Sequence, residues 1–168
     1  VISDAAILVR NSVEGGEKAG RIEAVGRKEE VEIPPGYRVI DLEKQYVIPG
    51  LINAHAHLIG SGKPRNTRTP EARKRLAWFL GTRIGKAIAL KWIRQNASNA
   101  LNAGVTTVRT VGDPHGYSIP IRREVEAGKR IGPRILAAGR IITSSGGHGA
   151  DFLAHVADSP WEARKAVR

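Results

Sequence analysis

Two histidines, His55 and His57, are the residues whose type and spacing point most directly to chemistry. They end an apolar segment, and the side chains of residues i and i+2 leave a β-strand on the same side. Both imidazoles could therefore bind one metal ion, and neutral imidazole suits zinc and its neighbours among the transition metals. The same spacing also fits a strand end with two ordinary histidines, because short motifs match by chance.

A third histidine, His148, belongs to a glycine-rich loop, residues 146–149, which follows a predicted strand. Loops after strands form the active-site face of β/α barrels, and glycine lets the backbone approach a ligand closely. His148 is therefore a candidate substrate-binding residue, although a glycine turn with a surface histidine gives the same pattern. Arg109, near the end of another predicted strand, and His115, in the loop after it, are further substrate-binding candidates.

The composition is that of a folded domain, with 41% of the 168 residues hydrophobic and 26% charged. No apolar run approaches the roughly 18 residues that a membrane span needs, and the first residues lack the layout of a signal peptide. We therefore expect a cytoplasmic protein without a membrane partner. The chain has no cysteine, which excludes disulfides and thiolate metal ligands.

The formal net charge is +11, a balance that can indicate binding to nucleic acid or to acidic membranes. The basic residues are scattered, however, and they do not alternate with aromatic side chains, which make up only 5% of the chain. We therefore predict that nucleic acid is not the partner.

The first fifty residues predict short strands at 5–10, 21–25 and 38–42, with a turn at Gly15-Gly16. Several short strands at this spacing indicate a small β-sandwich or a partial barrel. Fifty residues bury little core, so this unit would need partner strands from elsewhere.

After residue 50 the pattern changes to alternating strands and helices, which indicates an α/β fold of parallel β/α units. Such units build an open sheet or a (β/α)8 barrel of about 250 residues. The three strands predicted here are less than half of the eight strands of a full barrel. Signals for helix ends and starts are the glycines after two helices and the Ser-Pro-Trp-Glu sequence before a third. The predicted strands are 51–57, 105–111 (buried) and 134–142. The predicted helices are 70–103, which ends before Gly104, 121–127, which is closed by Gly128, and one that begins at Ser159. In the first of these helices, apolar residues recur at near-helical spacing at Ile84, Ile88, Trp92, Ala97 and Leu101.

Four segments together resemble the amidohydrolase superfamily of metal-dependent hydrolases. They are similar above all to the branch that contains prolidase-like dipeptidases, with imidazolonepropionase as a near neighbour, and the resemblance covers essentially the whole chain. The segments are 41–57, 101–112, 132–140 and 146–149.

The resemblance implies a β-sandwich, here residues 1–50, beside a distorted (β/α)8 TIM-like barrel that begins in residues 51–168. It implies one or two divalent metal ions, usually zinc, bound by His55 and His57, with His148 on the substrate side. The implied reaction is attack of metal-activated water on the carbonyl carbon of a small amide or dipeptide, which breaks its carbon–nitrogen bond.

Two positions depart from the pattern of these relatives: Asn53 stands where many have Asp, and Thr110 stands where this branch usually has Asp. The resemblance also implies a carboxylated lysine, two further histidines and an aspartate from later barrel strands. We therefore expect this chain to be the N-terminal portion of a hydrolase, with only part of the active site and no assignable catalytic base. The alternative is a complete, catalytically inactive remnant, a structural module whose open barrel edge would drive homo-oligomer formation.

Overall fold

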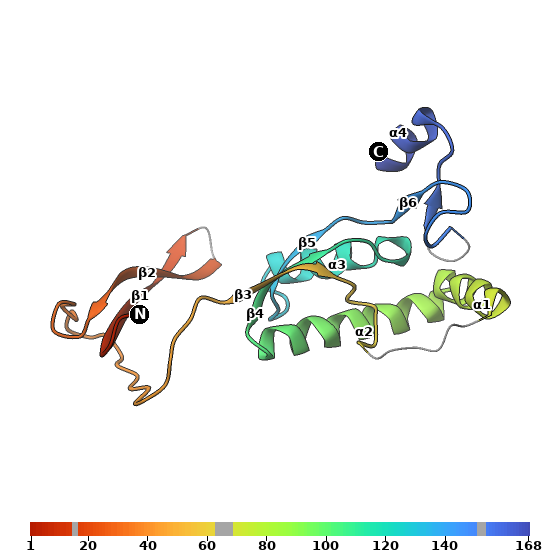
Figure 1. Ribbon diagram of the computed structural model, residues 1–168. Coiled ribbons are helices and arrows are strands. Elements are labelled where there is room, and N and C mark those ends of the chain that lie inside the picture. The colour runs from red at the N-terminus through yellow and green to blue at the C-terminus, as the bar shows by residue number, and fades with distance from the viewer. Residues whose placement is uncertain (15–16, 63–68, 151–153) are drawn as a thin grey trace. The chain divides into compact units, whose positions relative to one another are not determined.

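In the computed structural model the chain divides into two units, Val1–Ile48 and Pro49–Arg168, and Figure 1 labels most of their helices and strands. The turn predicted at Gly15-Gly16 lies outside the described residues. The structure describes residues 1–14, 17–62, 69–150 and 154–168.

The first unit contains an antiparallel ribbon of β1 (Ala5–Glu14) and β2 (Glu17–Arg27). The strands predicted at 5–10 and 21–25 are confirmed, and each lies inside a longer strand. Apolar side chains of the ribbon stay exposed, as Ile22 does at 66%. A two-stranded ribbon buries little apolar surface, so its stability depends on further packing.

The strand predicted at 38–42 is wrong, because these residues form no strand in the structure. The Oδ1 atom of Asp41 accepts a hydrogen bond from the N–H of Glu43 at 2.7 Å, in a local turn where Glu43 has a φ of 51°. Val39 stays 70% exposed, and a strand needs a hydrogen-bonded neighbour, which no described segment offers here. Among the described residues, the first unit contains one sheet, the two-stranded β1–β2 ribbon.

The second unit contains a parallel sheet in the order β3 (Leu51–Ala56), β4 (Val105–Thr110) and β5 (Arg134–Ala137). The predicted parallel β/α order is confirmed, whereas the prediction that β4 is buried is correct for one face only. Val108 is buried, but the neighbouring Arg109 is exposed. Successive side chains of a strand point to opposite faces, so helices cover one face of β4 and leave the other open.

The helix predicted at 70–103 is two helices, α1 (Pro70–Gly81) and α2 (Arg83–Asn102). The break is at Thr82, whose backbone is extended (φ −73°, ψ 161°) and whose hydroxyl accepts a hydrogen bond from the N–H of Gly85 at 3.0 Å. A Cβ at Gly85 would lie 1.9 Å from a backbone oxygen at the end of α1. The two helices can therefore meet so closely only because this residue is glycine.

In the first part of α2 the buried face lies one position further along than predicted, whereas Ala97 is buried as predicted. Ile84 and Trp92 are 70% and 47% exposed, and most of the buried positions carry small residues, which lets neighbouring elements approach the helix closely. The helix ends, as predicted, just before Gly104, which has a φ of +84°. The buried positions of α2 are Gly85, Ala89, Ile93 and Ala97.

The strand predicted at 134–142 is interrupted, because β5 ends early and Gly139, with a φ of +83°, turns the chain. The carbonyl of Gly139 accepts a hydrogen bond from the N–H of Asp113. Beyond this turn, β6 (Ile142–Thr143) and β7 (His155–Val156) form a short parallel pair.

A short 3₁₀ helix, η1 (Pro114–Gly116), precedes α3 (Ser118–Glu126). The helix predicted at 121–127 thus begins earlier than expected, and it ends before Gly128 as predicted, where φ is +64°. In the part of the chain that the structure describes, no helix is long and apolar enough to cross a membrane.

The last helix, α4 (Pro160–Val167), begins after Ser159 as predicted. The hydroxyl oxygen of Ser159 accepts a hydrogen bond from the N–H of Glu162 at 3.2 Å, and the Glu162 carboxylate accepts one from the N–H of Ser159 at 3.1 Å. This reciprocal pair is the predicted capping box, which satisfies two N–H groups at the helix start.

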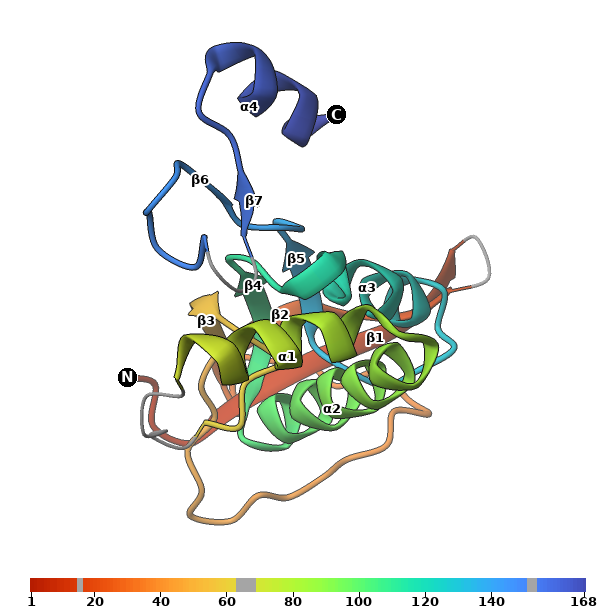
Figure 2. The same cartoon turned by 90° about the vertical axis from the view of Figure 1, so that its right-hand side faces the viewer.

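The apolar core of the second unit lies between one face of the sheet and the helices. Figure 2 shows α1, α2 and α3 together on this side of the strands. The opposite face keeps exposed apolar residues, such as Leu136, which is 46% exposed. The buried core residues are Leu58, Leu80, Ala89, Ile93, Ala97, Val108, Tyr117, Ile121 and Ile135.

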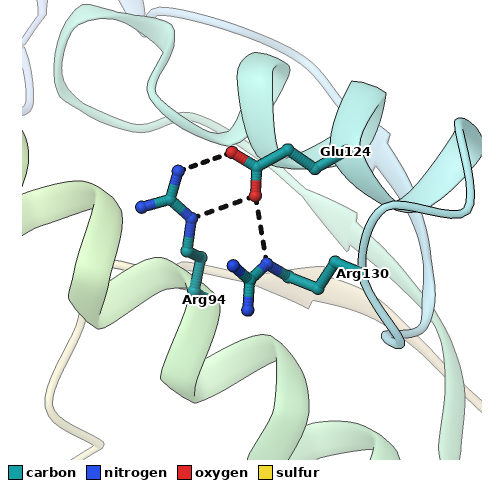
Figure 3. A network of polar contacts seen from close by, with 3 residues as sticks. All are labelled: Arg94, Glu124 and Arg130. Carbon is teal, nitrogen blue, oxygen red and sulfur yellow. Dashed lines mark hydrogen bonds and ion pairs between the residues drawn. The ribbon is translucent and has the colours of Figure 1, made fainter.

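A small polar network joins α2 to α3 (Figure 3). Arg94 of α2 donates two hydrogen bonds to the carboxylate of Glu124 on α3, at 3.0 and 2.5 Å, and Arg130 donates a third at 3.0 Å. The Arg94 guanidinium, with help from Arg130, lowers the pKa of Glu124 to about 2. The network therefore stabilises the contact between the two helices when Glu124 is ionised.

We expect Glu124→Gln to lower the free energy of unfolding by about 1 kcal/mol at pH 7. The pKa of Glu124 is about 2 in the folded protein and about 4.3 in an unfolded chain. The carboxylate therefore stabilises the fold fully above about pH 5, and this contribution is lost as the pH falls toward 2. Urea denaturation of both proteins at pH 7 and pH 3 measures the difference.

The matched control is Glu126→Gln, which removes an ion pair with Arg122 in which the glutamate side chain is 61% exposed. Its effect should stay within about 0.5 kcal/mol at both pH values. The prediction would be contradicted if Glu124→Gln lowered the free energy of unfolding by the same amount at pH 7 and at pH 3.

Candidate metal centre

The imidazoles of His55 and His57 lie together at the end of β3, on the same side of the strand. Their ring centroids are 5.5 Å apart and the rings meet edge to face at 73°. Ala56 and Leu58, which alternate with them, pack into the apolar core instead. The geometry that the spacing predicts, two imidazoles leaving the strand in one direction, is what the structure contains.

His57 makes one hydrogen bond that determines which ring nitrogen can bind a metal. Its Nδ1 atom lies 2.8 Å from the carbonyl oxygen of Gly112. A carbonyl can only accept, so Nδ1 must donate, and the neutral ring keeps an unprotonated Nε2. A histidine that is held in this way by a backbone carbonyl has the tautomer and the orientation that metal ligands use.

The backbone of His55 is held by a neighbouring side chain. The pairing of β3 with β4 shifts register between Asn53 and Ala56, and the N–H of His55 donates to Oδ1 of Asn53 at 3.1 Å. The asparagine thus satisfies a backbone donor at the irregular end of the strand.

Gly112, which supplies the carbonyl for His57, occupies a position that only glycine fits. Its φ is +140°, and a Cβ there would lie 2.2 Å from Cγ1 of Ile141. The close approach of Ile141 and the backbone conformation together fix the peptide that the His57 ring contacts.

Asp113 is a residue that the sequence analysis did not assign to the site, because an Asp-Pro pair indicates no more than a turn. It is 1% exposed, and its Oδ1 atom accepts a hydrogen bond from the N–H of Ser118 at 3.1 Å. Its other carboxylate oxygen has no hydrogen-bond partner within the described residues. Burial raises the pKa of Asp113, while the hydrogen bonds with Ser118 act in the opposite direction.

Arg109 shares the open face of the sheet with His55. Ala56 pairs with Thr110 across β3 and β4, and both pack toward the helices. The residues just before them, His55 and Arg109, therefore face the other side. Arg109 also pairs in register with the exposed Leu136 of β5.

The other two candidates have different surroundings. His115 has a φ of 56°, its ring lies 5.2 Å from that of Tyr117, and it borders Gly81 at the end of α1. His148 is exposed in the loop between β6 and β7. Among the residues that the structure describes, no interaction joins either histidine to the His55–His57 pair, and no group of three His, Cys, Asp or Glu could hold a metal.

Residues 46–168 match the model of the Amidohydrolase family. The chain belongs to this family. The family predicted from the sequence is thus confirmed, and so is the α/β class of the fold.

Three relatives with similar sequences or structures are each much longer than this chain. Imidazolonepropionase of Pseudomonas entomophila (strain L48) is 27% identical over an alignment that is 186 residues long, gaps included. The alignment covers 94% of this chain and 43% of that protein. The crystal structure of a candidate prolidase from Bifidobacterium longum is 35% identical with a TM-score of 0.62, covering 89% of this chain and 30% of that one. The crystal structure of a prolidase complexed with N-methylphosphonate-L-proline is 25% identical with a TM-score of 0.67. The match covers 88% of this chain and 36% of that one. The chain therefore spans less than half the length of these amidohydrolase relatives.

We expect Gly112→Ala to lower the free energy of unfolding by about 2–4 kcal/mol, because its Cβ would overlap with Ile141 and its φ disfavours a side chain. Urea denaturation at pH 7 measures this loss. The matched control is Gly128→Ala, which also has a positive φ but open space around it, and which should lose about 1–2 kcal/mol. Equal losses in the two variants would show that Ile141 does not constrain Gly112.

Proposed function

We propose that this chain is part of a metal-dependent hydrolase that cleaves carbon–nitrogen bonds in small amides or dipeptides. The observation that carries the proposal is the pair of imidazoles on the open face of a parallel sheet, with Nε2 of His57 left unprotonated by the Gly112 carbonyl. Membership of the amidohydrolase family supports the reaction class. The imidazolonepropionase and prolidase relatives support a substrate with an amide or peptide bond.

In this proposal His55 and His57 supply two nitrogen ligands to a divalent metal ion, for which zinc is the best match. Two imidazoles on one side of a strand fit such an ion, but a catalytic zinc takes about three protein ligands. We propose that the further ligands lie outside the described residues, so that this chain carries part of the site. When bound, the metal supplies Lewis acidity at the scissile carbonyl and activates the attacking water.

Arg109 is the residue that we propose for substrate recognition. Its side chain lies on the same face of the sheet as His55, and a guanidinium binds a carboxylate through two parallel hydrogen bonds. Dipeptides and acylated amino acids carry such a carboxylate. His148 and His115 are also proposed as substrate contacts, His148 because its glycine-rich loop admits a ligand, and His115 with less support because it packs beside α1.

The domain assignment is part of the same proposal. Residues 1–50 would contribute strands to a β-sandwich, and residues 51–168 would form the first three β/α units of a (β/α)8 barrel. Three parallel strands with their helices on one face support the barrel. A cytoplasmic location is proposed from the sequence alone.

We expect the full chain to bind Co²⁺, a spectroscopic substitute for zinc, with an affinity that falls at least about tenfold in His55→Ala and in His57→Ala. Each substitution leaves one imidazole of the pair, and a tenfold change corresponds to about 1.4 kcal/mol. Titration followed by visible absorption measures the affinity. His155→Ala, which removes a histidine from β7, is the matched control and should bind as the wild type does. Unchanged affinity in both site variants would rule out the proposed ligands.

We expect Arg109→Ala to raise KM about 10- to 100-fold for a substrate with a free carboxylate and to leave kcat nearly unchanged, because a charge-assisted contact is lost. Hydrolysis of X-Pro dipeptides and of their carboxamide analogues by the intact protein measures the effect. The carboxamides should show little difference between wild type and variant. Arg134→Ala, at the start of β5, is the control, and an equal rise in KM there would contradict a specific role for Arg109.

A further inference from the structure

One peptide unit, between Gly112 and Asp113, connects the ends of three strands. Its carbonyl oxygen accepts from Nδ1 of His57 at 2.8 Å, and its N–H donates to the carbonyl of Gly139 at 3.0 Å. In a trans peptide these two groups point in opposite directions, so the unit bridges the residue after β3 to the turn after β5. Donation by the N–H polarises the carbonyl and strengthens the bond to the imidazole.

The side chain of Asp113 fixes this peptide from the other direction. Its Oδ1 atom accepts from the N–H of Ser118, the first residue of α3, at 3.1 Å. The carboxylate is 1% exposed and therefore does not exchange this contact for water. Pro114 follows directly and restricts the backbone on the C-terminal side.

We propose that Asp113 is a positioning residue of the metal centre, which holds the Gly112 carbonyl where it orients the His57 ring and keeps Nε2 unprotonated. Asp113 does not itself bind the metal in this proposal. The inference rests on the proposed function, in which His57 is a ligand. Groups that orient metal-binding histidines typically change metal affinity 10- to 100-fold when they are removed.

The competing explanation is that Asp113 only caps the start of α3. In that case its removal would destabilise the fold but would leave the His57 ring as it is. The tautomer of His57 in the metal-free protein separates the two explanations, because capping alone does not affect it. Asp113→Asn keeps an oxygen acceptor at nearly the same volume, whereas Asp113→Ala removes the acceptor.

The experiment is nitrogen-15 NMR of the imidazoles in the metal-free full chain, at a pH where His57 is neutral, together with zinc titration of the same samples. The wild type and Asp113→Asn should show His57 protonated at Nδ1. Asp113→Ala should shift it toward the tautomer mixture of a free imidazole and bind zinc about 10- to 100-fold more weakly. The matched control is Asp158→Ala, which removes a carboxylate that also accepts a backbone N–H, that of Ser145 at 2.6 Å, and both readouts should stay unchanged.

Unchanged tautomer and zinc affinity in a folded Asp113→Ala, with zinc affinity lost in His57→Ala, would overturn the positioning role and leave the proposed function standing. Unchanged zinc affinity in His57→Ala would instead overturn the proposed function. The tautomer spectra would then still test whether Asp113 orients the His57 ring through the Gly112 carbonyl. If Asp113→Ala does not fold, Asp113→Asn decides: loss of the Nδ1-protonated form in that variant overturns the role of the oxygen acceptor.

Discussion

The hydrogen bond from His57 to the Gly112 carbonyl is the constraint on which the proposed metal centre depends. It joins residues that are 55 positions apart, and it forms only because β3 and β4 are adjacent and parallel, so that their carboxyl ends meet at one edge. The bond also requires glycine at position 112, where Ile141 leaves no room for a Cβ. The chemistry of one imidazole is thus determined by strand order and by the absence of a side chain in a neighbouring loop.

The division of the sheet into a packed face and an open face follows from the helices. Small residues on α2, such as Ala89 and Ala97, are fully or almost fully buried against the core, and the Arg94–Glu124 contact holds α2 to α3. The helices cover one face of the sheet in this way. Because successive side chains of β3 and β4 point to opposite faces, His55 and Arg109 lie on the uncovered face. The packing therefore decides which side chains remain available for a ligand.

Patterns that depend on neighbouring residues could be read from the sequence, and those that depend on distant contacts could not. The period of two in β3 predicted the imidazole pair, and the Ser159 capping box is complete within four residues. The strand predicted at 38–42 failed because a strand needs a partner, and the break at Thr82 was invisible because it depends on how closely α1 approaches Gly85. Asp113 was missed for the same reason, since its burial and its bond to Ser118 arise only in the folded unit.

The threonine at position 110, where the family resemblance leads us to expect aspartate, can be interpreted through the same packing. Thr110 is fully buried on the helix-covered face of β4, opposite to the face that carries His55. Asp113, three positions further along, is already a buried carboxylate with one oxygen that lacks a partner among the described residues. A second buried carboxylate nearby would add a further desolvation cost and mutual repulsion. With threonine at 110, Asp113 is the one buried carboxylate among the described residues, and position 110 lies on the face of β4 opposite to the one that carries Arg109.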